Sequence, residues 1–242
     1  MRARHRHFNA RHAGADLVLD ARYINQSDNT SVSAWTDRSA NNHSIAQSTA
    51  ANQPTFRTNQ MNGNPVVRFD GSNDFLDGGD ILDILNRGMT LICVAKISGG
   101  TNPTLVGKSR FGVSEGRYSL VRDNNTFLAL YQEASNAIAQ VSDTSTANRI
   151  NTMAINRGAT NTLFFDGAQQ AQNTTLSGST SYDNTNVFLV GVYQNSTGGT
   201  PPQSTYYLNG DIAQIVVNFT FNTPLRKRLE HAAAYSFKIA CS

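Results

Sequence analysis

The feature that most constrains the fold of this 242-residue chain is a succession of short strand-like segments, each closed by turn residues. In its middle part the segments are about five to nine residues long, a usual length for a β-strand. They are residues 89–97, 104–108, 117–121, 126–132, 137–141 and 150–157. No helical segment alternates with them, so the pattern predicts an all-β chain folded as a two-sheet antiparallel sandwich.

Turn signals divide the rest of the chain in the same way. Asp166-Gly167 is the clearest hairpin signal, because Asp and Gly suit the tight two-residue turn between antiparallel strands. Asn62-Gly63 and Asn209-Gly210 predict two further turns. Further strands are expected at residues 17–22, 187–193 and 212–219. Residues 64–76 predict a strand, a turn at Asp70-Gly71 and a second strand, forming a hairpin at the sandwich edge.

Near the end of the chain the spacing of apolar residues changes from that of a strand to that of a helix. Thr223 is a good N-cap and Pro224 suits the first helical position. Apolar and small side chains then recur on one face, at Leu225, Leu229, Ala232, Ala233 and Ser236. We therefore expect one closing helix over about residues 223–238. A single turn of helix is also expected at residues 81–85.

Composition bounds the class of protein. Hydrophobic residues make up 39% and charged residues 15%, which excludes a disordered chain and leaves enough apolar surface for a core. We find no linker after residue 17, so residues 17–242 are expected to form one domain. Cys93 and Cys241 are the only cysteines, and both are expected to stay reduced.

The first sixteen residues form a basic arm that contains Arg2, Arg4, Arg6 and Arg11. Such an arm is either a solvated tail or a tether that docks on a larger assembly. It lacks the apolar run of a secretion signal, and no stretch of the chain approaches a membrane span.

Three stretches carry a resemblance to a known family. They are Leu17-Val18-Leu19-Asp20-Ala21 and Trp35-Thr36-Asp37-Arg38-Ser39, followed by the run from Asn64 to Leu76. With these, the chain resembles the concanavalin A-like lectin/glucanase superfamily in its laminin-G-like branch. One departure is Ala40, where such proteins usually place a glycine. The resemblance implies a jelly-roll sandwich, often a glycan binder, of a kind frequent on secreted proteins and phage virions.

Glycan binding needs aromatic faces that stack on sugars and polar groups that bond to hydroxyls. On that basis Tyr118, Tyr131, Tyr193 and Tyr206, beside predicted strands, are the candidate sugar-binding residues, with Asn195 on a polar loop. Trp35 is expected in the core instead.

Catalysis and metal binding are less favoured interpretations of the sequence. Glycoside hydrolysis needs two carboxylates about 5 to 9 Å apart. The three glutamates, Glu115, Glu133 and Glu230, have no acidic partner at strand spacing, so we expect no catalytic residues. Asp70, Asn73 and Asp74 crowd oxygen atoms into one turn, as calcium prefers, but tight turns use the same residues. A structural turn is favoured there, and no cofactor is required.

The expected function is a non-enzymatic virion-associated protein, a decoration, fibre or tail component with a lectin-like surface for glycan binding or adhesion. Its arm would tether it to other virion proteins or to copies of itself, and cell-surface glycans would be its ligands. The alternatives are a structural capsid cement protein without sugar binding and, below that, a glycoside hydrolase. We expect no membrane insertion and no nucleic-acid partner. The chain would reach the virion from the host cytoplasm without a signal peptide, or else be extracellular.

Overall fold

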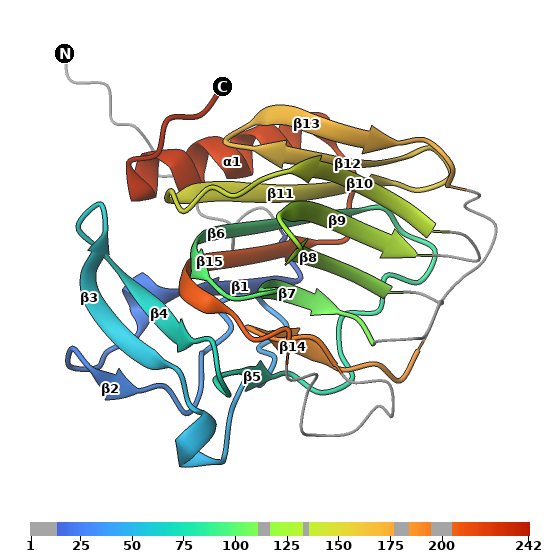
Figure 1. Cartoon of the computed structure of the whole chain (residues 1–242). Helices are drawn as coiled ribbons and strands as arrows, with labels where there is room; N and C mark the ends of the chain where they lie inside the picture. Colours follow the sequence, from blue (N-terminus) through green and yellow to red (C-terminus); the bar gives the residue numbers. More distant parts are fainter. Residues whose placement is uncertain (1–13, 111–116, 133–135, 177–183, 195–204) are drawn as a thin grey trace.

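The computed structural model describes residues 14–110, 117–132, 136–176, 184–194 and 205–242. In that part, two antiparallel sheets pack face to face and one helix lies outside them (Figure 1). The larger sheet has the strand order β13-β12-β11-β6-β15-β4-β3-β2, and β1 also pairs with β15. The smaller sheet has the order β10-β9-β8-β7-β14-β5. The predicted all-β sandwich with one C-terminal helix is confirmed.

The larger sheet contains β1 (Leu17–Asp20), β2 (Thr30–Ser31), β3 (Thr55–Met61), β4 (Asn64–Asp70), β6 (Met89–Gly99), β11 (Arg149–Asn156), β12 (Thr160–Phe165), β13 (Ala168–Asn173) and β15 (Asn209–Asn218). The smaller sheet contains β5 (Leu76–Asp77), β7 (Thr104–Lys108), β8 (Arg117–Asp123), β9 (Thr126–Gln132), β10 (Asn136–Ser142) and β14 (Phe188–Val190). Two short 3-10 helices, η2 (Ala21–Tyr23) and η3 (Ala50–Asn52), lie in the first quarter of the chain.

Strand β6 explains why part of the sequence reads as an unbroken apolar run. Leu91 and Cys93 face the core between the sheets, while Ile92 and Val94 belong to a second cluster beneath the helix. Alternate residues of a strand point to opposite faces, so a strand covered on both sides has no polar face. Cys93 is fully buried, and burial raises the pKa of its thiol.

The helix α1 (Thr223–Phe237) covers the outer face of the larger sheet (Figure 1). Leu229, Ala233 and Phe237 pack there against apolar side chains of β6 and β15. The predicted helix is confirmed, but its cap is one residue earlier than expected. The side chain of Asn222 accepts a hydrogen bond of 3.0 Å from the Leu225 N–H, and Thr223 is the first helical residue.

Two predicted hairpin turns are present. Asn62 and Gly63 have φ angles of 52° and 89°, and Asp166 and Gly167 have 48° and 82°. Two successive positive φ angles define the turn that fits the twist of adjacent antiparallel strands. The first turn joins β3 to β4 and the second joins β12 to β13.

Three local expectations were wrong. Asn209-Gly210 is not a turn: it begins β15, where a Cβ on Gly210 would meet the Lys96 carbonyl oxygen at 2.3 Å. Residues 81–85 form no helix, since Leu82 and Leu85 have φ angles of 61° and 50°.

The third concerns residues 64–76, which are not an edge hairpin. β4 lies inside the larger sheet, between β15 and β3, whereas β5 belongs to the smaller sheet. The turn that follows β4 therefore carries the chain from one sheet to the other.

The described end of the predicted arm belongs to the sandwich. Ala15 is buried beneath the helix, and the Asp16 N–H donates to the Val217 carbonyl at 2.8 Å. Asn218 bonds the Gly14 carbonyl at 3.0 Å. Residues 14–16 are thus held by β15, while Arg2, Arg4, Arg6 and Arg11 lie outside the described residues.

Candidate functional site

The acidic turn between the sheets uses its oxygen atoms to hold its own backbone. One carboxylate oxygen of Asp70 accepts from the N–H groups of Ser72 at 2.8 Å and Asn73 at 3.2 Å. Asp74 accepts from the Asp70 N–H at 3.0 Å, and the Asn73 amide donates to the Ala51 carbonyl at 2.9 Å. These are the bonds of a structural turn. Within the described ranges, no group of three or more His, Cys, Asp or Glu side chains could hold a metal ion.

Tyr118 and Tyr131 lie opposite each other on β8 and β9, and both rings are fully buried between the sheets. The Tyr118 hydroxyl donates to the Leu82 carbonyl at 2.8 Å. A ring without exposed surface cannot stack on a sugar, so the expectation for these two tyrosines is corrected. The reason is strand register: each ring takes the inward position of its strand. Asn195 lies outside the described residues.

The other two candidate tyrosines come together. The rings of Tyr193 and Tyr206 are 5.3 Å apart between centroids and tilted by 39°. Tyr193 is buried and Tyr206 half-buried. Burial raises the pKa of both phenols, so each remains a neutral hydroxyl at neutral pH.

Sequence reasoning missed an arginine that is hydrogen-bonded to Tyr193. The Arg117 Nη1 donates to the Tyr193 hydroxyl at 3.2 Å and to the Arg110 carbonyl at 3.1 Å, and its Nε donates to Gln132. Arg117 begins β8 and Gln132 ends β9, directly opposite in register. In the sequence, Arg117 and Gln132 each stand next to a tyrosine that points inward, so they fall on the opposite face of their strands. This alternation was the signal that could have found them. We call Arg117, Gln132, Tyr193 and Tyr206 the tyrosine–arginine cluster. It combines a ring face with oriented donors, which suits a polyhydroxylated ligand.

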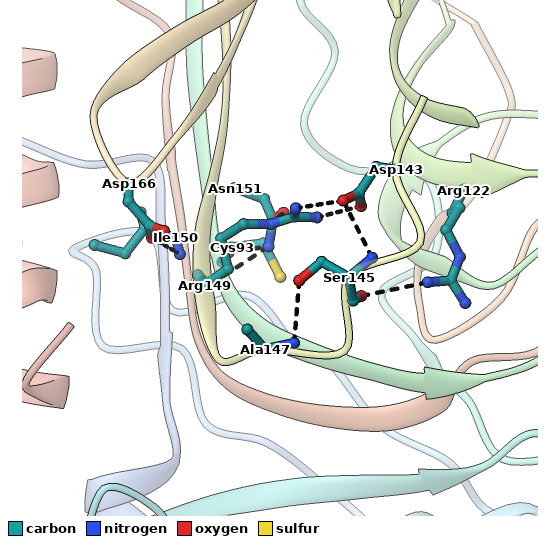
Figure 2. A network of polar contacts seen from close by, with 9 residues as sticks. All are labelled: Cys93, Arg122, Asp143, Ser145, Ala147, Arg149, Ile150, Asn151 and Asp166. Atoms are coloured by element: carbon teal, nitrogen blue, oxygen red, sulfur yellow. Dashed lines mark hydrogen bonds and ion pairs between the residues drawn. The ribbon is translucent and has the colours of Figure 1, made fainter. Parts of the chain in front are cut away.

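A second arginine network, shown in Figure 2, is fully occupied by protein. Arg149 donates to both carboxylate oxygens of Asp143, at 3.0 and 2.8 Å, and to Asn151 at 2.9 Å. Its guanidinium also lies 3.5 Å from the centroid of the Phe165 ring. Burial opposes ionisation of Asp143, but the bonds and charge of Arg149 outweigh it and hold its pKa below the ordinary value. This network fastens the link between β10 and β11, and so ties the two sheets together.

Carboxylates elsewhere in the described part also have structural partners. Asp80 and Asp83 both bond the buried Lys108 ammonium, at 2.6 and 2.8 Å. Glu230 is buried against Arg226 on the closing helix. Glu115 and Glu133 lie outside the described residues. These contacts account for the acidic pairs as packing features.

No family model and no curated protein matches the sequence. Solved structures share the fold. The binding domain of botulinum neurotoxin serotype D superposes with a TM-score of 0.63 at 11% identity, covering 95% of this chain and 53% of that one. Trypanosoma rangeli sialidase in complex with sialic acid superposes with a TM-score of 0.62 at 16% identity, covering 95% and 34%. The chain spans about half of the first and a third of the second, and such likeness shows a shared β-sandwich fold alone.

None of the helices in the described ranges has the length and apolar character needed to cross a membrane.

Proposed function

We propose that this chain is a non-enzymatic glycan-binding module, and that the tyrosine–arginine cluster contacts the sugar. The observation that carries the proposal is the meeting of Tyr193 and Tyr206, 5.3 Å apart, beside an arginine fixed by hydrogen bonds. The fold supports it, because the similar structures include a toxin receptor binding domain and a sialidase in complex with sialic acid.

Each member of the tyrosine–arginine cluster has its own role in the proposed site. Tyr206, half-buried, offers the stacking surface, and the ring of Tyr193 packs against it. Hydrogen bonds hold Nε and Nη1 of Arg117, while its Nη2 has no partner among the described residues. That nitrogen is therefore available to a sugar hydroxyl in a fixed direction.

The setting we propose is a laminin-G-like virion protein, a decoration, fibre or tail component of a phage. Its basic arm would bind other virion proteins or further copies of the chain. This part rests on the sequence: the resemblance, the basic arm and the neutral polar composition. Deleting residues 1–13 keeps the contacts of Gly14 and Ala15 and should abolish incorporation into particles. Unchanged incorporation would remove the tether from the proposal.

The test of sugar binding is a glycan array with the intact chain. We expect binding above background that the double variant Arg117→Gln, Tyr206→Ala reduces by about tenfold or more, since it removes a charged donor and a stacking face. The matched control is Tyr235→Ala, at a 66% exposed tyrosine of the closing helix. No binding by the intact chain would favour the alternative, a purely structural cement protein.

A further inference from the structure

A pocket of about 280 Å³ lies beside η2, and none of its lining residues belongs to the tyrosine–arginine cluster. Asp20, Tyr23, Trp35 and Arg38 are among the residues that line it. Pockets for drug-sized ligands start at about 300 Å³, so this one suits a single sugar ring. Exposed amide and hydroxyl groups of Asn25, Gln26 and Thr36 surround it.

An aromatic ring and a guanidinium form its most exposed part. Tyr23 is 57% exposed, unusual for a large aromatic side chain of this protein. The Arg38 guanidinium lies over that ring, 4.5 Å from its centroid. Among the residues described, Arg38 makes no side-chain hydrogen bond and no ion pair. Its N–H donors are thus oriented by the ring and left for another acceptor.

The neighbouring acids do not neutralise Arg38. Asp20 is 3% exposed and is bonded to Arg22 through both carboxylate oxygens, with a further bond of 2.9 Å from Gln214. Asp37, also 3% exposed, accepts the backbone N–H groups of Val18 and His43. Of the two charged side chains that line the pocket, Asp20 and Arg38, only Arg38 has no hydrogen-bond or ion-pair partner in the described part.

A second, independent observation comes from Trp35. The residue is 1% exposed and lines the pocket, yet its indole N–H has no hydrogen-bond partner among the residues that the structure describes. A buried unpaired donor costs about 1–3 kcal/mol, and this one lies behind the pocket wall without exposed surface of its own. The indole is therefore sensitive to whatever fills the pocket that its side chain lines.

We infer that this pocket is a second binding site, which takes one carboxylate-bearing sugar residue. The sugar packs against the exposed part of Tyr23, beside the Trp35 side chain, and its carboxylate pairs with Arg38. Guanidinium and carboxylate match as a bidentate pair, and this selects an acidic sugar over its neutral analogue. The site stands apart from the proposed function, which concerns other residues.

Trp35 makes the test direct, because it is the only tryptophan and gives one indole N–H resonance. The intact ¹⁵N-labelled chain is titrated with methyl glycosides of glucuronic, galacturonic and N-acetylneuraminic acid, and with those of glucose and galactose. We expect at least one acidic glycoside to shift the indole resonance with saturation. Its neutral counterpart should bind about tenfold more weakly, the value of one charge-assisted hydrogen bond.

Variants locate the effect. Arg38→Gln should reduce the acidic glycoside to the affinity of the neutral one, and Tyr23→Ala should weaken both. The controls are Arg228→Gln and Tyr235→Ala, at exposed positions of the closing helix, and Arg117→Gln, which separates this site from the cluster. All three should leave the titration unchanged. An indole resonance that no acidic glycoside moves, or equal affinity for acidic and neutral sugars, overturns the inference.

Discussion

Five arginines in the described part of the chain lie over aromatic rings, and the surroundings of two of them, Arg149 and Arg38, differ in one respect. Arg149, over Phe165, also bonds Asp143 and Asn151, so protein groups occupy its guanidinium. Arg38, over Tyr23, has the ring alone in the described part of the chain. The same pair of residue types thus forms a structural tie in one place and an open recognition surface in the other. Counting the partners of each donor, rather than noting residue type, separates the two.

The largest expected effect comes from a change at Arg149, the arginine whose guanidinium is bonded to protein groups. Arg149→Met removes one partner of a buried ion pair and leaves Asp143 without its counter-charge, which should cost about 3 kcal/mol in the free energy of unfolding. Arg38→Gln, the matched change at the open site, should stay within about 0.5 kcal/mol. Urea unfolding of both variants measures the difference. Equal losses would mean that Arg38 is a structural residue too.

A second prediction uses a buried carboxylate without a cation. Burial and the nearby Asp70 raise the pKa of Asp74 to about 7, against about 3.9 in an unfolded chain. The folded state therefore binds the proton more tightly, and stability is lost as pH rises from about 4 to about 7. Asp74→Asn keeps an acceptor for the Asp70 N–H but cannot ionise. Above pH 7 it should unfold at a higher urea concentration than the parent, with no difference near pH 4.

Asp143 should behave in the opposite way, because its pKa is lowered by Arg149. Its contribution is present above the unfolded-state pKa of about 3.9 and is lost as pH falls through the folded-state value. The parent should lose stability more steeply than Arg149→Met below about pH 4. If urea unfolding shows that the parent and Arg149→Met lose stability equally as the pH falls below about 4, the result would argue against a stabilising role for this pair.

The smallest expected effect concerns the open site. A double-mutant cycle between Tyr23→Ala and Arg38→Gln should give a coupling free energy of about 0.5 kcal/mol, the value of an exposed cation–π contact. A coupling several times larger would indicate that the two side chains are held by more of the fold than their own contact.

Sequence reasoning reached the fold because its signals are local. The Asp166-Gly167 turn and the Pro224 start of the helix depend only on backbone preferences of a few residues. Inward and outward positions of a strand depend on pairing across the sheet, and so Tyr118 was mistaken for a surface ring. Arg38 lay inside a recognised motif, but its lack of a partner is a property of the folded surroundings. Candidate binding sites depend on such properties of the folded structure, which local sequence signals do not contain.

The pairing of β1 with β15 has a consequence for biosynthesis. Leu17 lies opposite Val217, and β15 fills the space between β6 and β4 in the middle of the larger sheet. A nascent chain that has not yet released residues 209–218 from the ribosome leaves three strands with open edges, which are prone to pair with other chains. The larger sheet can therefore be completed only after residues 209–218 have left the ribosome, and it forms slowly, since its contacts join distant parts of the sequence.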